Sequence, residues 1–530
     1  MPDTLRRALP LSAAVLASRV LGLVRETVFA AIFGAGAVAD AYQVAFRIPN
    51  LLRDLFAEGA LSNAFVPTFT AALQQDGRAR AEALADLVMS LLLVVTGIIT
   101  GLAMLFAGPI VDAMAGGFAG DTAKVALTVE LTQVMLPILV LVSLAAVWMG
   151  MLNAQRRFVV PALAPALFNV VSIAIGLVVF FMGGTVERAI FVWSVGTLAA
   201  GAAQALVQVV ALGRMGYRPR LRLRGALADP GVRRIARLMA PAIIGIAAVN
   251  VNVFINTSFA GSLGDGPVAQ LSYAFRLFFV PLGMFGVAIA TVTATSISEE
   301  AAKGDRAALA QRTADGGWAT WMLVSASAVL MWVLAEPIVR LCFRWGATTH
   351  DDAQLIAAVL RSYVLGLVPY ALVKLYAPAY YSVDRARVPM VASILGVAAN
   401  LAFNAATYRE LGAPGIALGT TIGALVNVAV LRFAFGSGVA PLPCAGMVKH
   451  GIALLLANAV LAGIAYGGLW LIARVPAAGD WTVRVLDAAV VGGVGLVGVI
   501  GFALVLARLG YPGADKLLRV LRRRSRARSG

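Results

Sequence analysis

Apolar segments long enough to cross a membrane recur along the whole chain, separated by short polar segments. A membrane-spanning helix needs about 20 apolar residues, whereas a barrel strand needs about ten in an alternating pattern. The observed pattern therefore predicts helices, and we expect an all-α membrane protein with about 14 transmembrane helices. The predicted helix centres are Leu23, Leu55, Leu93, Leu139, Ile173, Ser194, Asn250, Met284, Val329, Val368, Leu395, Thr421, Val460 and Gly495.

Composition supports this class of protein. The 530 residues are 60% hydrophobic and 13% charged, which excludes an ordinary soluble domain. The net charge of +17 could indicate a nucleic-acid partner. We expect no nucleic acid, because the basic residues lie in alternate loops and form no single soluble patch.

The distribution of basic residues predicts the topology. Roughly 28 of the 43 Lys and Arg fall in loops on one side of the membrane, and about six fall in the opposite loops. Those six are Lys124, Arg188, Arg344, Arg409, Arg474 and Arg484. The positive-inside rule then places both termini in the cytoplasm, in agreement with an even number of helices. The basic loops are expected to contact anionic lipids.

A sequence repeat divides the chain into two similar halves. Ala45-Phe46-Arg47 recurs as Ala274-Phe275-Arg276, and the segment from Arg157 to Pro161 recurs from Arg385 to Pro389. The two matches are offset by 229 and 228 residues. Nearly equal offsets indicate a duplicated six-helix unit.

The repeat predicts a domain organisation. Because each unit has an even number of helices, the two lobes are expected to be parallel repeats, as in transporters that rock two lobes about a central cavity. The expected parts are an N-lobe at 1–213, a basic cytoplasmic linker at 214–231, a C-lobe at 232–436, two appended helices at 437–508 and a basic cytoplasmic tail at 509–530.

Charged residues interrupt the apolar segments at specific places. The arginines are Arg19, Arg25, Arg47, Arg53 and Arg276. Each costs about 2.5 to 3.5 kcal/mol at the centre of a bilayer, so their presence needs a reason. At 100° per residue, Arg19 and Glu26 share one helix face, and a second stripe holds Asp40, Arg47, Asp54 and Glu58. As the repeat-mate of Arg47, Arg276 is expected to approach the same central cavity from the other lobe.

Two interpretations of these charges are open. The arginines and acids can neutralise each other as buried ion pairs that fix helix register. Alternatively they bind an anion, which the choice of arginine favours because its planar fork suits bidentate binding of phosphate or carboxylate. For Lys374 the alternatives are ligand contact and snorkelling to the interface.

Other polar residues give weaker indications. Asn250, Asn252 and Asn256 could ligate a coupling cation or hydrogen-bond between helices, and the identity of any coupling ion stays open. We expect no other cofactor and no metal site. The sequence has no Gly-rich phosphate loop, paired histidines or nucleophile elbow, so we expect a transporter and not an enzyme.

The sequence resembles the lipid II flippases, the MurJ/MviN family of the exporter superfamily that also contains multidrug and polysaccharide transporters. The resemblance rests on Ser18 to Gly22 with Arg25, on Asp40 to Arg53, on Leu55 to Pro67, on Tyr273 to Ala288, and on Lys374 to Ser382. It extends from about residue 10 to residue 440.

The resemblance implies both an activity and a site. The activity is transfer of lipid II, the undecaprenyl-diphosphate disaccharide pentapeptide, from the inner to the outer leaflet of the bacterial cytoplasmic membrane for peptidoglycan synthesis. Arg19, Arg25, Arg53 and Arg276 match family positions that serve the anionic headgroup, with Asp40 and Glu58 as functional acids. Glu26 stands where the family usually has aspartate. Arg47, Asp54 and Lys374 are secondary candidates, and contacts with cell-wall synthesis proteins are left open.

Three alternative functions remain at this stage. An exporter of another lipid-linked saccharide would share all of these features. A cation-coupled multidrug exporter would need acids and aromatic residues in its cavity, and an arginine-lined cavity has the wrong sign for cationic drugs. An integral lipid-phosphate enzyme would need a cluster of metal-binding carboxylates, and Asp54 and Glu58 alone are weak evidence for such a cluster.

Overall fold

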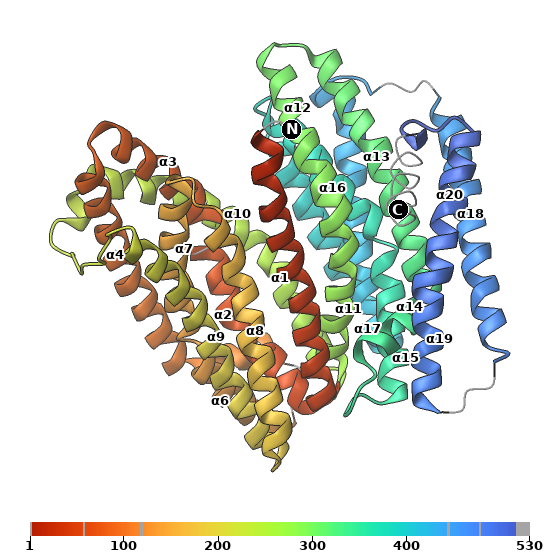
Figure 1. Ribbon diagram of the computed structural model, residues 1–530, viewed down its shortest axis with the longest axis horizontal. Coiled ribbons are helices and arrows are strands. Elements are labelled where there is room, and N and C mark those ends of the chain that lie inside the picture. The colour runs from red at the N-terminus through yellow and green to blue at the C-terminus, as the bar shows by residue number, and fades with distance from the viewer. Residues whose placement is uncertain are drawn as a thin grey trace. The chain divides into compact units, whose positions relative to one another are not determined.

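A computed structural model describes residues 3–56, 59–116, 118, 120–442, 446–475 and 479–515. These residues form helices and turns without any strand (Figure 1), which confirms the predicted all-α class. The helices group into two compact units. One comprises residues 1–269 with 346–348, and the other comprises 270–345 with 349–530.

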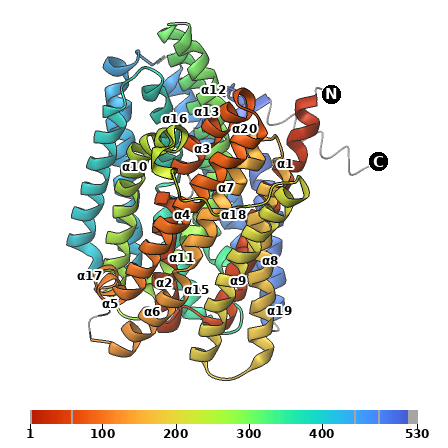
Figure 2. The same ribbon diagram turned by 90° about the vertical axis from the view of Figure 1, so that its left-hand side faces the viewer.

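The first unit is a bundle of long helices joined by short loops. Its helices are α1 (Asp3–Phe33), α2 (Ala37–Phe56), α3 (Gly59–Gln75), α4 (Arg78–Leu105), α5 (Ala107–Met114), α6 (Thr122–Met135), α7 (Ile138–Ala154), α8 (Val159–Met182), α9 (Val186–Arg214), η1 (Ala226–Ala228) and α10 (Pro230–Gly261). α8 packs against both α1 and α9, and α8 and α9 run side by side (Figure 2).

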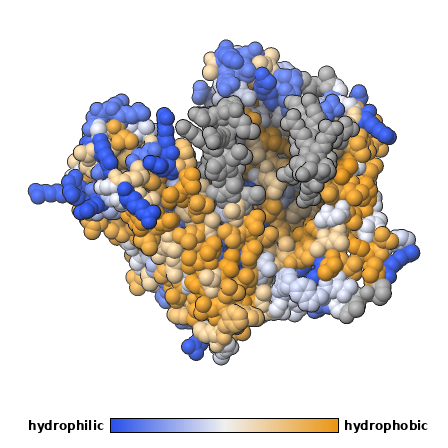
Figure 3. Space-filling view, in the orientation of Figure 1, coloured by the Kyte–Doolittle hydropathy of each residue, from blue (hydrophilic) through white to orange (hydrophobic). Residues whose placement is uncertain are grey.

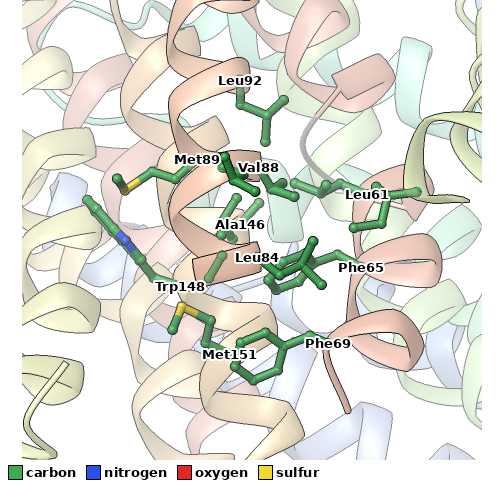
Figure 4. Close-up of a cluster of buried hydrophobic side chains, with 14 of the residues drawn as sticks. Leu61, Phe65, Phe69, Leu84, Val88, Met89, Leu92, Ala146, Trp148 and Met151 are labelled. Atoms are coloured by element: carbon green, nitrogen blue, oxygen red, sulfur yellow. The ribbon is translucent and has the colours of Figure 1, made fainter. Parts of the chain in front are cut away.

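One apolar core lies where α3, α4 and α7 meet (Figure 4). Phe65 and Phe69 on α3 are four residues apart and so project from the same face toward Leu84 on α4 and Met151 on α7. Gly150 gives the ring of Phe65 room, because a methyl group at that position would collide with the ring.

Helix starts in both units follow ordinary capping chemistry. The side chain of Asp229 accepts hydrogen bonds from the amides of Gly231 and Val232, and Pro230 occupies the first turn of α10. Thr349 and Asp352 form a reciprocal capping box at the start of α15 (His350–Val364). Short side chains with local hydrogen bonds therefore end the loops and begin the long apolar helices.

The second unit also consists of helices. Besides α15, they are α11 (Pro267–Pro281), whose first three residues belong to the first unit, η2 (Leu282–Gly286), α12 (Val287–Ala302), α13 (Arg306–Val333), α14 (Ala335–Phe343), α16 (Leu367–Tyr381), α17 (Arg387–Gly438), α18 (Met447–Ile472), α19 (Asp480–Ala489), η3 (Val490–Val494) and α20 (Gly495–Arg508).

Helix α17 is two helices in succession. Gly412 has φ 60° and ψ −148°, a conformation that a residue with a side chain avoids, and Pro414 follows it. The halves on either side are about 25 residues each, and each is long enough to cross a bilayer. Two further breaks, η2 and η3, are π-helical turns inside otherwise α-helical segments.

The appended helices α18 and α20 pack on α13. Leu454 of α18 and Phe502 of α20 meet Met322 of α13 in one buried cluster. An ion pair attaches α19 to α14, because the guanidinium of Arg340 donates to both carboxylate oxygens of Asp487 at 2.6 and 2.9 Å. The two helices outside the repeat are thus integral parts of the second unit.

Ten helical segments of the described chain are long and apolar enough to cross a membrane. These are Arg78–Leu105, Thr122–Ala154, Val159–Met182, Val186–Arg214, Pro267–Ala302, Arg306–Val333, His350–Tyr381, Arg387–Gly438, Met447–Ile472 and Asp480–Arg508. Hydrophobic side chains cover the middle of the helices on the face shown in Figure 3. The chain is therefore a multi-pass membrane protein.

The count of 14 helices stays a prediction. All predicted centres fall within helices, but α1, α2 and α10 are not among the ten apolar segments, and α17 is counted once. The boundary between the packed units, after Ala269, also differs from the predicted start of the second repeat at 232. Packing and sequence repetition are separate criteria, so the predicted domains stay predictions as well.

Candidate functional site

The three candidate residues of α1, Arg19, Arg25 and Glu26, lie on its second half. Arg19 is exposed, whereas Arg25 and Glu26 are largely buried, with side chains 12% and 5% exposed. Nη2 of Arg25 donates to Oε1 of Glu26 at 2.5 Å, and its guanidinium lies 5.4 Å from the centre of the Phe168 ring. This arginine is therefore largely buried and lies next to a carboxylate and an aromatic ring.

A close contact between α1 and α8 fixes this part of the helix. The side-chain amide of Asn169 donates to the carbonyl of Ser18 at 3.1 Å. The same side chain lies over Gly22, where a methyl group would reach ordinary van der Waals distance of the amide nitrogen. Gly22 therefore lies at a close contact between α1 and the Asn169 side chain of α8.

The predicted stripe on α2 is divided among different partners. Nη1 of Arg47 donates to the hydroxyl of Thr257 on α10 at 2.9 Å. Nη2 of Arg53 donates to Oδ1 of Asp54 at 2.9 Å, and both side chains are about one-third exposed, at 31% and 34%. The adjacent pairs Arg25–Glu26 and Arg53–Asp54 show that acids do neutralise arginines locally. Glu58 lies outside the described residues.

Asp40, at the start of α2, is completely buried, and its carboxylate has three donors from the protein. Oδ1 accepts from the amide of Ala269 at 2.8 Å, and Oδ2 accepts from the amide of Gly266 at 2.7 Å. The third donor is the ammonium of Lys124, 3.1 Å from Oδ2. The described contacts of Asp40 are therefore those of a helix cap and an ion pair.

Lys124 is a residue whose role the sequence interpretation missed. It was assigned to a polar outer loop, but it lies in the first turn of α6 with its side chain 3% exposed. Besides Asp40, its ammonium donates to Oδ1 of Asp265 at 2.8 Å and to the carbonyl of Gly264 at 3.2 Å, and it lies 4.1 Å from the centre of the Phe118 ring. Its place in the first turn of an apolar helix could have indicated burial.

The remaining candidates lie in the second unit. Arg276 is partly buried on α11, five residues before Pro281 and the π-helical turn η2. Lys374 is exposed on α16. The expected approach of Arg276 to the arginines of α1 and α2 stays a prediction, as does the assignment of all these residues to a substrate site.

The linker after α9 is held against α4 by a buried acid. Oδ1 of Asp86 accepts from the hydroxyl of Tyr217 at 2.7 Å and from the amide of Arg220 at 3.1 Å, and Oγ of Ser90 accepts from the amide of Arg222 at 2.8 Å. Burial, together with the hydrogen bond to Asp86, raises the pKa of Tyr217 above its usual value. The phenol is therefore a neutral donor at physiological pH.

The candidate arginines can form hydrogen bonds and ion pairs with anions. Across the described ranges, His, Cys, Asp and Glu nowhere form a group of three or more that could hold a metal ion. Arg25 and Arg53 each present a guanidinium that is hydrogen-bonded to a neighbouring carboxylate. A guanidinium of this kind is a planar donor whose geometry suits carboxylate and phosphate oxygens.

Comparisons with known proteins agree on one family. A model of the family "Lipid II flippase MurJ" matches residues 29–490. The probable lipid II flippase MurJ of Rhizobium meliloti is 35% identical over 426 residues, covering 79% of this chain and 78% of that protein. The lipid II flippase MurJ of Burkholderia cenocepacia is 32% identical over 461 residues, covering 87% and 89%.

Solved structures show the same fold. A structure of lipid II flippase MurJ in an inward closed conformation has a TM-score of 0.76 at 21% identity, covering 94% of this chain and 99% of that one. An inward-facing multidrug transporter of the MATE family has a TM-score of 0.64 at 17% identity, covering 81% and 97%. At these identities the likeness concerns the fold alone. The family match and the two relatives show that the chain belongs to the MurJ family of lipid II flippases.

Proposed function

We propose that this chain moves lipid II, the undecaprenyl-diphosphate disaccharide pentapeptide, from the inner to the outer leaflet of the bacterial cytoplasmic membrane. The observation that carries the proposal is the buried pair of Arg25 and Glu26 in a chain of this family. A largely buried guanidinium paired with a carboxylate suits a site where an anion binds transiently.

The proposed substrate site is cationic. Arg25, Arg53 and Arg276 bind the diphosphate, and Arg19 shapes the site. Glu26 and Asp54 compete with the diphosphate for the arginine donors and favour its release when the two lobes rock. Arg47 and Lys374 are secondary positions in this proposal, and Glu58 is the further acid implied by the family.

The proposal for Asp40 differs from that for the arginines. Its predicted role as a substrate-binding acid would place it next to the headgroup, but its carboxylate is buried and already accepts from Lys124, Gly266 and Ala269. These contacts support an indirect role, in which Asp40 holds Lys124 and the start of α11 in place and does not touch the substrate.

The basic loops supply the proposed orientation and lipid contacts. With both termini in the cytoplasm, the linker held by Asp86 faces the anionic inner leaflet. Its exposed residues alternate arginines with leucines, and Leu221 and Leu223 are 74% and 54% exposed. Such a strip suits the boundary between anionic headgroups and acyl chains. Contacts with cell-wall synthesis proteins remain part of the proposal without a surface assigned to them.

Depletion of the cell's own flippase tests the proposal. Cells that rely on this chain should grow, whereas cells that rely on Arg25→Ala or Arg276→Ala should lyse with lipid II retained in the inner leaflet. Arg188→Ala, at an exposed arginine near the start of α9, is the matched control and should support growth. Full rescue by both site variants would contradict the proposed site. Accumulation of a different lipid-linked saccharide would contradict lipid II as the substrate.

A further inference from the structure

Lys124 and Asp40 form a buried ion pair in the first unit that the transport site does not account for. The two residues are 4% and 0% exposed. A charge this deeply buried is tolerated only where an opposite charge and hydrogen bonds compensate it. The ammonium of Lys124 has three acceptors, namely Asp40, Asp265 and the carbonyl of Gly264, so each of its N–H groups can be satisfied.

The carboxylate of Asp40 in turn caps a helix from a distance of more than 200 residues in sequence. The first amides of a helix have no partner within the helix. At the start of α11, the amides of Gly266 and Ala269 both donate to Asp40. A negative charge at a helix N-terminus also interacts favourably with the helix dipole. Asp40 therefore fixes the first turn of α11, provided that it stays ionised.

The helix that Asp40 caps is also the helix that carries Arg276. Seven residues separate Ala269 from Arg276, which is about two turns or roughly 10 Å of continuous helix. A helix of this length transmits the orientation of its first turn. The direction of the Arg276 side chain thus depends on the anchoring of the first turn.

We propose that Lys124 is a positioning residue for transport: by pairing with Asp40 it holds the first turn of α11, and through that helix it orients Arg276. The inference rests on the proposed function for the role of Arg276 and on the structure alone for the anchoring of α11. Lys124 does not touch the substrate. Asp265 adds a second carboxylate to Lys124, at 2.8 Å, from a side chain that is 59% exposed.

Hydrogen exchange of the purified full-length protein tests the anchoring without any substrate. In Lys124→Met the segment containing Gly266 and Ala269 should exchange at least about tenfold faster than in the wild type, because the cap loses its compensating charge. The amides of Arg220 and Arg222, which Asp86 and Ser90 hold in the same unit, should exchange as before. Lys303→Met, at an exposed lysine directly after α12, is the matched control and should change neither segment.

Binding of undecaprenyl diphosphate tests the connection to Arg276. Lys124→Met should weaken the Kd about tenfold in an otherwise wild-type chain. In the Arg276→Gln background, adding Lys124→Met should change the Kd by less than about twofold, since a residue that acts through Arg276 has no further effect once Arg276 is gone. A residue with a general structural role would weaken binding equally in both backgrounds.

The outcomes separate the two proposals. Unchanged exchange of the 266–269 segment, or equal weakening of the Kd in both backgrounds, would overturn the role of Lys124. A wild-type chain that does not bind undecaprenyl diphosphate would contradict the proposed function, and the exchange experiment would still decide whether Lys124 anchors α11. If Lys124→Met does not fold, the variant Lys124→Met/Asp40→Asn removes both buried charges and is measured in its place, with faster exchange of the same segment expected.

Discussion

The carboxylate of Asp40 accepts a hydrogen bond from the amide of Ala269 at 2.8 Å, and these two residues are 229 positions apart. The same offset relates Arg47 to Arg276 in the sequence repeat. The predicted repeat would thus make Asp40 and Ala269 equivalent positions. In the structure, Asp40 at the start of α2 caps the start of α11.

Replacement of Asp40 should destabilise the protein strongly. In Asp40→Ala the ammonium of Lys124 stays buried without its main counter-charge, and breaking a buried pair on one side costs about 3 to 5 kcal/mol. Unfolding in mixed detergent micelles should show this loss. The control is Asp76→Ala, at an exposed acid after α3, which should change the free energy of unfolding by less than about 0.5 kcal/mol. Equal stability of the two variants would contradict the ion-pair account.

Replacement of Glu26 should strengthen binding of the headgroup and slow transport. Glu26→Gln removes the carboxylate that Arg25 contacts, so the guanidinium becomes more available to a diphosphate. A hydrogen bond to a charged group contributes about 1.5 to 3 kcal/mol, so the Kd for undecaprenyl diphosphate should fall by at least tenfold. Release should be slower, and growth rescue weaker.

The matched control for this prediction is Glu82→Gln. Glu82 accepts from Arg78 on the partly exposed surface of α4 and should affect neither binding nor growth. An unchanged Kd in Glu26→Gln would show that the carboxylate does not compete with the ligand.

Gly346 should tolerate no side chain. Its φ is 53°, and a methyl group there would collide with the carbonyl oxygen of Ala31. That oxygen also accepts the amide of Ala347 at 2.8 Å, so it has little freedom to move. Gly346→Ala should cost about 2 to 5 kcal/mol from backbone strain and overpacking together. Thermal unfolding should compare it with Gly304→Ala, where φ is 75° but the space is open and only the backbone strain of about 1 to 2 kcal/mol applies.

The linker should contribute a pH-dependent term to stability at alkaline pH. The pKa of Tyr217 is raised in the folded state above its usual value near 10, first by burial and then by its hydrogen bond to Asp86. When a group has a higher pKa in the folded than in the unfolded state, its contribution to stability is complete at pH values below the pKa of the unfolded state. That contribution is lost as the pH rises from there through the pKa of the folded state. Stability of the wild type should therefore fall as the pH rises beyond about 10.

The variant Tyr217→Phe tests whether ionisation of Tyr217 causes the loss of stability at alkaline pH. At neutral pH it should lose about 1 kcal/mol, because the buried carboxylate of Asp86 keeps the amide of Arg220 but loses the phenol. Beyond pH 10 its stability should fall less steeply than that of the wild type. Parallel curves for the two proteins would exclude Tyr217 as the titrating group.

The ion pair between Arg340 and Asp487 should hold α19 on α14. The side chains are 20% and 5% exposed, so Arg340→Met leaves a buried carboxylate and should cost about 3 to 5 kcal/mol. The double variant Arg340→Met/Asp487→Leu should recover most of this loss, because no uncompensated charge remains. Arg344→Met, which breaks the pair with the exposed Asp480, should cost less than about 1 kcal/mol. Hydrogen exchange of residues 480–489 gives a local measurement.

Hydropathy predicted the positions of the helices well. Every segment that crosses the lipid must be apolar and must pair its backbone hydrogen-bonding groups internally, which a helix does. All the predicted centres, from Leu23 to Gly495, lie in helices. The predicted centres Leu395 and Thr421 fall in the two successive helices of α17, on either side of the break at Gly412, but the position of that break was not predicted. Helix boundaries and breaks of this kind depend on a few residues with unusual backbone angles, and an average over 20 residues cannot resolve them.

The partners of the charged residues were much harder to predict. A helical wheel correctly places Asp40 and Arg47 on one stripe, but it says nothing of helices distant in sequence. Asp40 pairs with Lys124 and Arg47 with Thr257, at separations of 84 and 210 residues. Lys124 was assigned to an outer loop because the count of basic residues treats every charge near a helix end as solvated. Tertiary packing decides which of these charges are buried.

The π-helical turn Leu282–Gly286 changes how side chains beyond it face. Such a turn accommodates the equivalent of one extra residue, and each residue of an α-helix advances by about 100°. A wheel drawn without interruption from Arg276 therefore misplaces every side chain from Val287 to Ala302 by roughly a quarter of a revolution. Deleting a single residue within the turn would restore regular winding and leave α12 facing as it does now, whereas the present sequence wound as an uninterrupted α-helix would turn the whole of α12 by about 100°.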